Sequence, residues 1–262
     1  MRKIRAIREE EENGSYTNCC QGEVHHWDDD GSNYSGAYKY PDEPVQGCAK
    51  DCFFIAALKA VAYKANDRLL PETDNFRFLN TETMTVETIT LNDRNLAYTS
   101  DNRLVYAKGR SGFLWPMLYE KAYAMWLNSK KSPANQHWDA IDKTQPDIEA
   151  IFADGGGNGI TAIMQITHYR DVHEKPSNTT MNSEAFEDGI PLYPTVVATK
   201  NIPAPQLALP DKLIPQHTYM IDSADQQYYF LINPCDPTNT NLRLYRSRLT
   251  DVKFATWGYV RP

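Results

Sequence analysis

Apolar residues recur at helical spacing in the segment that follows Asp51. Phe54, Leu58 and Val61 fall three or four positions apart among good helix formers, which predicts a helix with one buried face. Asp51 is a preferred N-cap residue, because its side chain can accept a hydrogen bond from the first free N–H groups. We therefore expect this helix to begin at Cys52.

Further helices are expected in the middle of the chain. Residues 113–127 repeat the amphipathic pattern, and Pro116 suits the first turn of a helix. A short helix is expected to end over 148–152, before the run Gly155-Gly156-Gly157, which we interpret as a cap, a turn and the hinge between two lobes. Another short helix is expected over 183–188.

Alternating, β-branched segments indicate strands, most of them in the second half of the chain. They are expected at residues 83–91, 191–199, 217–223, 227–232, 242–245 and 259–260. Residues 104–106 are the expected partner of 83–91, and 71–80 are expected to form a loop. Helices followed by antiparallel strands predict the α+β class.

Length and composition limit the functional classes. A chain of 262 residues with 41% hydrophobic residues and 16 Tyr can bury a core, as one large domain or as two lobes. The net charge of −7 argues against nonspecific binding of nucleic acid. No apolar run approaches the roughly 20 residues of a membrane span. Residues 1–12 are charged and lack the apolar core of a secretory signal, so we expect a cytoplasmic protein, or one exported without a signal peptide.

The five cysteines do not have the spacing of a zinc site. Their odd number favours free thiols in a reducing compartment, although a bridge from Cys19 or Cys20 to another cysteine stays open. The acidic run Asp28-Asp29-Asp30 does not fit an EF-hand, because its carboxylates do not alternate. We expect it to be a solvated loop, and we expect no metal site or cofactor; whether the core binds calcium stays open.

Candidate chemistry centres on Cys52. A thiol in the first turn of a helix has its pKa lowered by the free backbone N–H groups there, which predicts a nucleophilic thiolate. The amide of Gln46, six residues earlier across a turn, is placed to donate a hydrogen bond to an oxyanion. For a lone cysteine, an inert buried thiol is the more common case.

His217 and Asn233 change that balance. They stand at the open ends of two strands joined by the turn 224–226, so a hairpin brings them together. Asn233 is then able to orient His217, and His217 to take the proton of Cys52.

Three stretches resemble the calpain-like cysteine peptidases, a family with a papain-type mechanism. The first is Gln46-Gly47-x-x-x-Asp51-Cys52-Phe53, which corresponds to the family pattern QGxxGDCW. The second is Leu114-Trp115 with Glu120-Lys121-Ala122-Tyr123-Ala124, which corresponds to the LEKAYAK helix of the family. The third is His217-Thr218-Tyr219 with Asn233-Pro234, which corresponds to HAY…NPWG. The turn over 187–191 is also similar to the second lobe of that family.

The resemblance implies a two-lobed papain-like fold with substrate in the cleft between the lobes. Residues 1–40 are then a polar lead-in, 41–157 a helix-rich lobe with the nucleophile, and 158–262 a β-rich lobe with His and Asn. It also implies roles for four residues: Cys52 as nucleophile, His217 as general base and acid, Asn233 as its orienter and Gln46 as oxyanion donor.

The departures from the family pattern fall near the substrate. Lys50 replaces a Gly, Phe53 replaces a Trp, and Thr144 lies where a cleft glycine is expected. Cys235 replaces the Trp of NPWG, which would leave the bond between His217 and Asn233 exposed unless Trp257 or another aromatic residue covers it.

The sequence therefore predicts a cysteine endopeptidase that acts on proteins. The resemblance to compact calpain-like cores adds the hypothesis that the protein is a bacterial toxin or effector. For an effector, the expected partner besides the protein substrate is an inhibitor or immunity protein. Two alternatives stay open: a deamidase or other acyl transferase on protein glutamine with the same triad, and a binding module without catalysis.

Overall fold

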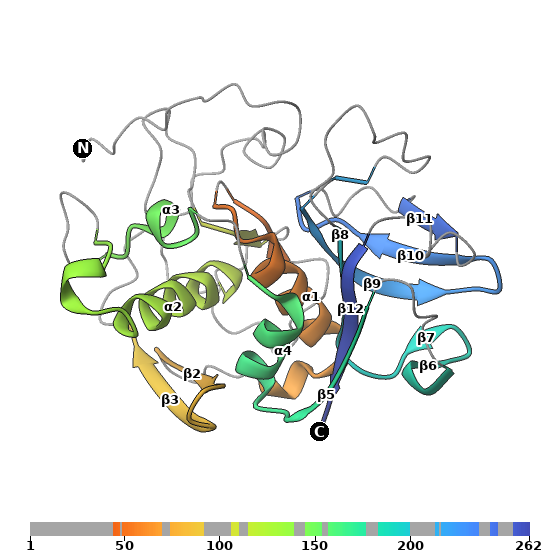
Figure 1. Cartoon of the computed structure of the whole chain (residues 1–262), viewed down its shortest axis with the longest axis horizontal. Coiled ribbons are helices and arrows are strands. Elements are labelled where there is room, and N and C mark those ends of the chain that lie inside the picture. The colour runs from red at the N-terminus through yellow and green to blue at the C-terminus, as the bar shows by residue number, and fades with distance from the viewer. Residues whose placement is uncertain are drawn as a thin grey trace.

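A bundle of helices with a β-hairpin packs against one antiparallel sheet (Figure 1). The computed structural model describes residues 44–47, 49–69, 74–91, 106–109, 115–138, 145–153, 157–176, 183–199, 213–214, 216–235, 242–245 and 254–262. The predicted acidic loop at 28–30 and the predicted substrate-cleft residue Thr144 lie outside these ranges. The α+β class is confirmed; the proposed lobe boundaries stay a prediction.

Helix α1 (Cys52–Lys64) runs through the centre of the molecule. It begins at the predicted residue, and its first eleven residues, Cys52 to Ala62, are all buried. It contacts α2, α4 and the strands β8 and β9, so its neighbours surround it. The prediction of a single buried face is therefore wrong, because a helix that is apolar on all sides is a core helix.

Helices α2 (Trp115–Ser129) and α4 (Gly159–Thr167) lie beside α1. The first confirms the predicted helix with Pro116 in its first turn. The second was not predicted; its N-terminus is capped by Asn158, whose Oδ1 accepts hydrogen bonds from the N–H groups of Ile160 (2.8 Å) and Thr161 (3.4 Å). The short α3 (Ile148–Ile151) lies where a short helix was predicted to end, over 148–152.

The six-stranded sheet has the order β11-β10-β9-β8-β12-β5, and all its pairs are antiparallel. Its strands are β5 (Asp171–Pro176), β8 (Thr195–Thr199), β9 (Thr218–Ala224), β10 (Tyr228–Ile232), β11 (Leu242–Tyr245) and β12 (Phe254–Arg261). The predicted hairpin is β9 and β10, where Met220 pairs with Ile232 near the open end.

Alternate residues of the sheet enter two different cores. Val196 and Met220 point to the helices and join the larger core around α1, whereas their neighbours Val197 and Tyr219 join a second core on the opposite face. This alternation is the period of two expected of strands. The sheet therefore carries a helical layer on one face and, on the other, the small strands β6 (Phe186–Glu187) and β7 (Ile190–Pro191).

The turn between β6 and β7 closes over the end of β9. Asp188 and Gly189 both have positive φ, and a Cβ on Gly189 would lie 1.9 Å from the carbonyl oxygen of Ala224. Only glycine fits this close approach. The predicted helix over 183–188 is reduced to one 3₁₀ turn, η4 (Ser183–Ala185), because β6 begins at Phe186.

A second correction concerns the hairpin of β2 (Asn75–Asn80) and β3 (Thr85–Thr90), which packs on α2 and α4. The strand at 83–91 is confirmed, but its partner is 75–80, which we expected to be a loop. Of the expected partner 104–106, only Tyr106 is described, and it lies outside the strands. The remaining small elements are β1 (Pro44–Val45), β4 (Lys108–Gly109), η2 (Asn66–Arg68) and η3 (Pro133–Asn135).

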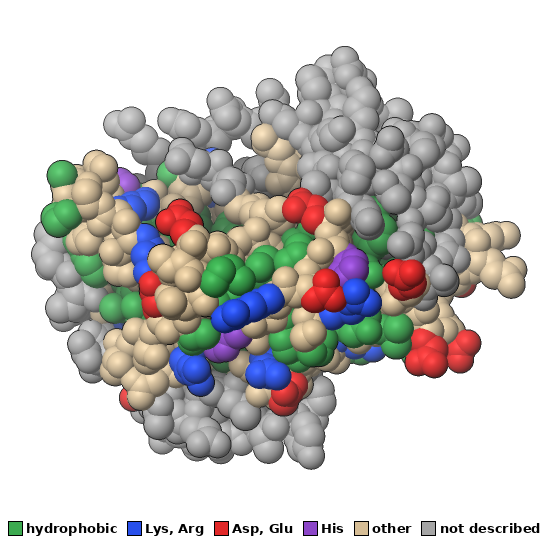
Figure 2. All heavy atoms as spheres, turned by 60° about the horizontal axis from the view of Figure 1, so that its bottom comes forward, with side chains coloured by type: hydrophobic (Ala, Val, Ile, Leu, Met, Phe, Trp, Pro, Cys, Tyr) green, Lys and Arg blue, Asp and Glu red, His purple; other side chains and the backbone are tan. Residues whose placement is uncertain are grey.

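The lower face of the molecule carries acidic and basic side chains side by side, with hydrophobic side chains between them (Figure 2). At one point of the sheet Arg261 Nε lies 2.6 Å from Asp171 Oδ2 across the β5–β12 pair. No helix among the described residues is long and apolar enough to cross a bilayer.

Candidate active site

Cys52 is the first residue of α1, and its free thiol is buried. Its Sγ lies 4.0 Å from the carbonyl oxygen of Gln216, the residue before His217. The N-terminus of α1 therefore faces the beginning of β9, which brings the helix that carries the cysteine to the strand that follows the histidine.

Asp51 occupies the N-cap position, but its side chain makes no capping hydrogen bond. Only its backbone oxygen serves the helix, by accepting from the N–H groups of Phe54 (2.7 Å) and Ile55 (3.1 Å). The prediction of a capping Asp51 is thus right for its position and wrong for its side chain.

The thiol of Cys52 is neutral in this structure. Burial raises its pKa to about 11, and the charge of Asp51 acts in the same direction, against hydrogen bonds from the backbone of Thr218 and Phe53. The expected low pKa is therefore wrong for the protein without substrate, because desolvation outweighs the helix N-terminus. A thiolate at this position needs a base that takes its proton.

His217 and Asn233 meet at the open end of the β9–β10 hairpin, as the spacing predicted. The ring Nε2 of His217 lies 2.8 Å from Oδ1 of Asn233, and both side chains are buried. The same Oδ1 accepts from the N–H of Cys235 at 3.0 Å, which fixes the orientation of the amide. Because Asn233 presents an acceptor, Nε2 must carry the proton.

The other ring nitrogen of His217 is then left with its lone pair. Nδ1 is buried and has no hydrogen-bond partner among the described residues. Burial lowers the pKa of His217 to about 4, against the raising effect of the hydrogen bond with Asn233. The imidazole is therefore a neutral, oriented base with one nitrogen available.

Gln46 joins the two halves of this arrangement. Its backbone N–H donates to the oxygen of Pro234 at 2.9 Å, so the segment before Cys52 is tied to the segment after Asn233. Its side chain is buried, and Nε2 donates to the oxygen of Ala49 at 2.7 Å. This bond uses one of the two amide hydrogens and holds the group beside the start of α1.

A comparison with known families matches the part of the chain that holds this arrangement. The model of the calpain family of cysteine proteases matches residues 38–248, which include all four candidate residues. The chain belongs to the calpain family of cysteine proteases. It is therefore a hydrolase, and its substrates are proteins. A comparison with curated proteins found no match.

Cys235, at the position of the calpain-family Trp, is disulfide-bonded, and its partner lies outside the described residues. The expectation of free thiols is therefore wrong for this residue. Its Sγ lies 3.2 Å from Oε1 of Gln46 and 4.0 Å from Nε2 of His217. A disulfide sulfur carries no proton, so these approaches are packing contacts.

The bond between His217 and Asn233 is shielded without that Trp. His217 is 1% exposed and Asn233 8%, and the edge of Tyr219 packs on the imidazole with ring centroids 4.9 Å apart. Trp257 belongs to the core on the far face of the sheet. The aromatic residue that covers this bond is therefore Tyr219 and not Trp257.

The remaining residues assigned to the substrate region lie in different environments. Lys50 is exposed, and its charge lowers the pKa of Glu149, against the burial that raises it. Phe53 is buried edge-on against the rings of Tyr123 and Phe152. The backbone of Gly157 approaches the Phe53 ring so closely that a Cβ there would lie 2.2 Å from it. Phe53 is thus a core residue behind the nucleophile.

Sequence reasoning missed one feature of the site, a buried pair of acids. Asp51 and Glu120 are both fully buried, and their carboxyl groups hydrogen bond to each other. The signal was a Glu-Lys pair within an otherwise apolar helix. No group of three or more His, Cys, Asp or Glu in the described ranges could hold a metal ion.

Proposed function

We propose that the chain is a cysteine endopeptidase that cleaves protein substrates through an acyl-enzyme, with Cys52, His217, Asn233 and Gln46 as its machinery. The observation that carries the proposal is the imidazole of His217, which is bound to Asn233 through Nε2 and has a buried, unpartnered Nδ1. Such a group is a base that lacks only its proton donor.

In the first step the Cys52 thiol gives its proton to Nδ1 of His217 while Sγ attacks the scissile carbonyl carbon. Because both groups are neutral before this transfer, the charge pair forms only as substrate binds. The oxyanion receives hydrogen bonds from the backbone N–H of Cys52 and from the remaining amide hydrogen of Gln46. The imidazolium then protonates the leaving amine, and the C–N bond breaks.

In the second step His217 takes a proton from water, which attacks the thioester carbon. The tetrahedral intermediate collapses, the C–S bond breaks, and the proton returns to Sγ. Asn233 keeps the imidazole in one tautomer and orientation through both steps. Its amide is itself fixed by the N–H of Cys235.

A protein-cleavage assay with mass readout tests this function. Wild type is expected to give two fragments of a sensitive substrate, and Cys52→Ala to reduce the rate by at least ~10⁴-fold. An intact product one dalton heavier would instead indicate deamidation of glutamine. A Cys52→Ala variant as active as wild type would rule out this mechanism.

The oxyanion role of Gln46 has its own test. Gln46→Ala is expected to lower kcat by about 10²-fold with a smaller effect on KM, since the bond forms mainly in the transition state. Gln227→Ala, at an exposed turn, is the matched control and is expected to be silent. An unchanged kcat in Gln46→Ala would contradict the role.

The role as a toxin or effector rests on the resemblance to compact calpain-like proteins alone. It predicts that expression of the wild-type chain arrests the growth of a susceptible cell and that Cys52→Ala does not. Equal growth arrest by both chains would separate the cellular effect from catalysis.

A further inference from the structure

The buried acid pair of Asp51 and Glu120 lies directly behind the nucleophile. Both residues have 0% exposure, and they come from α2 and from the residue that precedes α1. Glu120 Oε2 accepts a hydrogen bond from the N–H of Ala107. Apart from its bond with Glu120 and a bond with its own backbone N–H, the Asp51 carboxyl has no donor among the described residues, and the other oxygen of Glu120 has none besides Asp51.

Two carboxyl groups can share a hydrogen bond only when one of them carries a proton. Glu120 is that donor, because its bond with Asp51 raises its own pKa and lowers that of Asp51. Burial raises both pKa values, to about 7 for Asp51 and well above the ordinary value for Glu120. The pair therefore carries at most one charge near neutral pH.

The direction of the Asp51 side chain matters for the proposed catalysis. An aspartate at an N-cap normally turns back to the first N–H groups of the helix. Here these groups belong to the turn that contains Cys52, where the oxyanion is to be held. A capping carboxylate would bond the N–H of Phe53 or Phe54, next to the Cys52 N–H that is to hold the oxyanion, and would place a negative charge where the reaction creates another.

We propose that Glu120 is a positioning residue, which by hydrogen bonding the Asp51 carboxyl keeps that carboxyl away from the N-terminus of α1, where the acyl oxyanion is to be held. This role rests on the proposed function. It accounts for the absence of a capping bond at Asp51 and for a buried acid in the middle of α2.

The other ionisable groups near Asp51 do not replace Glu120. From α1, Cys52 is neutral; from α2, Tyr123 is neutral and donates its hydroxyl to Gln165 of α4 at 2.7 Å. The buried Lys59 is eight residues further along α1 (59 − 51), about 12 Å along the axis. Lys121 follows Glu120 and so points about 100° away around α2.

The experiment compares kcat and KM for peptide hydrolysis in wild type, Glu120→Gln, Glu120→Leu and the double variant Asp51→Ala with Glu120→Leu. Glu120→Gln keeps a donor and an acceptor and is expected to stay within about threefold of wild type. Glu120→Leu leaves Asp51 free to cap the helix, and kcat is expected to fall at least about tenfold with KM little changed. The double variant removes that carboxyl and is expected to recover most of the loss.

The pH profile provides the second readout. Wild type is expected to lose kcat/KM as pH rises through about 7, because Asp51 then becomes charged beside the nucleophile. Asp51→Asn is expected to lack this loss, and it answers the question if Glu120→Leu does not fold. A full loss in Asp51→Asn, or a double variant as slow as Glu120→Leu, would overturn the positioning role.

The two proposals fail differently. A wild-type chain without peptidase activity would count against the proposed function. An active wild type with an equally active, folded Glu120→Leu would count against the positioning role alone.

Discussion

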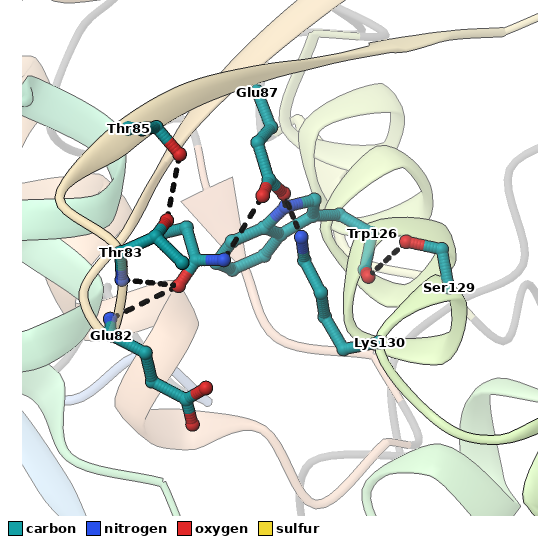
Figure 3. A network of polar contacts seen from close by, with 8 residues as sticks. Glu82, Thr83, Thr85, Glu87, Trp126, Ser129 and Lys130 are labelled. Atoms are coloured by element: carbon teal, nitrogen blue, oxygen red, sulfur yellow. Dashed lines mark hydrogen bonds and ion pairs between the residues drawn. The ribbon is translucent and has the colours of Figure 1, made fainter.

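Two glutamates join α2 to other parts of the molecule, in opposite surroundings. Glu87 of β3 is partly exposed and accepts hydrogen bonds from Trp126 Nε1 (2.7 Å) and Asn80 Nδ2 (3.0 Å). It also pairs with Lys130, so that three donors converge on one carboxylate and fix the hairpin to the end of α2 (Figure 3). Glu120 is fully buried, and its partner is a second acid.

The difference shows how donors decide the charge of a carboxyl group. Lys130, followed by Asn80 and Trp126, lowers the pKa of Glu87 to about 2, whereas burial raises the pKa of Glu120. A charged carboxylate suits a surface clamp, because it strengthens each hydrogen bond. A pair that carries at most one charge suits a position beside a reaction that creates negative charge.

The largest expected difference is in stability. Glu120→Ala leaves the N–H of Ala107 without a partner and removes the Asp51–Glu120 bond from the core, and is expected to lower the free energy of unfolding by about 3 kcal/mol. Glu87→Ala removes a partly exposed clamp and is expected to cost about 1 kcal/mol. Urea unfolding at pH 6 measures both. Equal losses would contradict the contrast between the two sites.

The pH dependence of stability is expected to have opposite signs at the two sites. Burial raises the pKa of Asp51 from 3.8 to about 7. The contribution of Asp51 to the free energy of unfolding is therefore present below pH 4 and is lost as pH rises towards 7. The pKa of Glu87 is lowered from 4.5 to about 2, so its contribution is present above pH 4.5 and is lost as pH falls towards 2.

Unfolding of Asp51→Asn and Glu87→Gln from pH 3 to 8 measures this. The loss of unfolding free energy caused by Asp51→Asn is expected to become smaller as pH rises. The loss caused by Glu87→Gln is expected to become smaller as pH falls. Two costs that change in the same direction with pH would show that the two carboxyl groups are not held in different charge states.

The smallest expected effect belongs to Lys130. Lys130→Met removes one of the three donors to the Glu87 carboxylate. It is expected to lower the free energy of unfolding by about 0.5 kcal/mol or less and to leave peptidase activity unchanged. It should also raise the pKa of Glu87 towards 4.5, which carboxyl NMR shifts measure. Lys131→Met is the neighbouring control. A Glu87 pKa that stays near 2 in Lys130→Met would assign the shift to Asn80 and Trp126 instead.

Local patterns predicted those parts of the fold that local chemistry determines. The hairpin of β9 and β10 follows from alternation and a short turn, and it was enough to bring His217 and Asn233 together. Helix α4 was missed because the glycine run before it was interpreted only as a breaker, although Asn158 signals a helix start. Strand β2 was missed because its six residues follow a Pro-containing segment.

The acid pair could not be predicted from the sequence, because its partners lie 69 positions apart (120 − 51). Local propensity assigns Asp51 to the helix cap, whereas tertiary packing gives its side chain another partner. The pKa of Cys52 was missed for a related reason. The helix N-terminus can be located from the sequence, but the burial that outweighs it depends on the whole fold.

The central claim, that His217 activates Cys52, is tested most directly by the rate at which an irreversible thiol inhibitor alkylates Cys52, mapped by mass spectrometry. The account predicts fast labelling of Cys52 in wild type and in the control His137→Ala, whose side chain is exposed. It predicts labelling at least ~10²-fold slower in His217→Ala. Equal rates in His217→Ala and wild type, or labelling that avoids Cys52, would contradict the account.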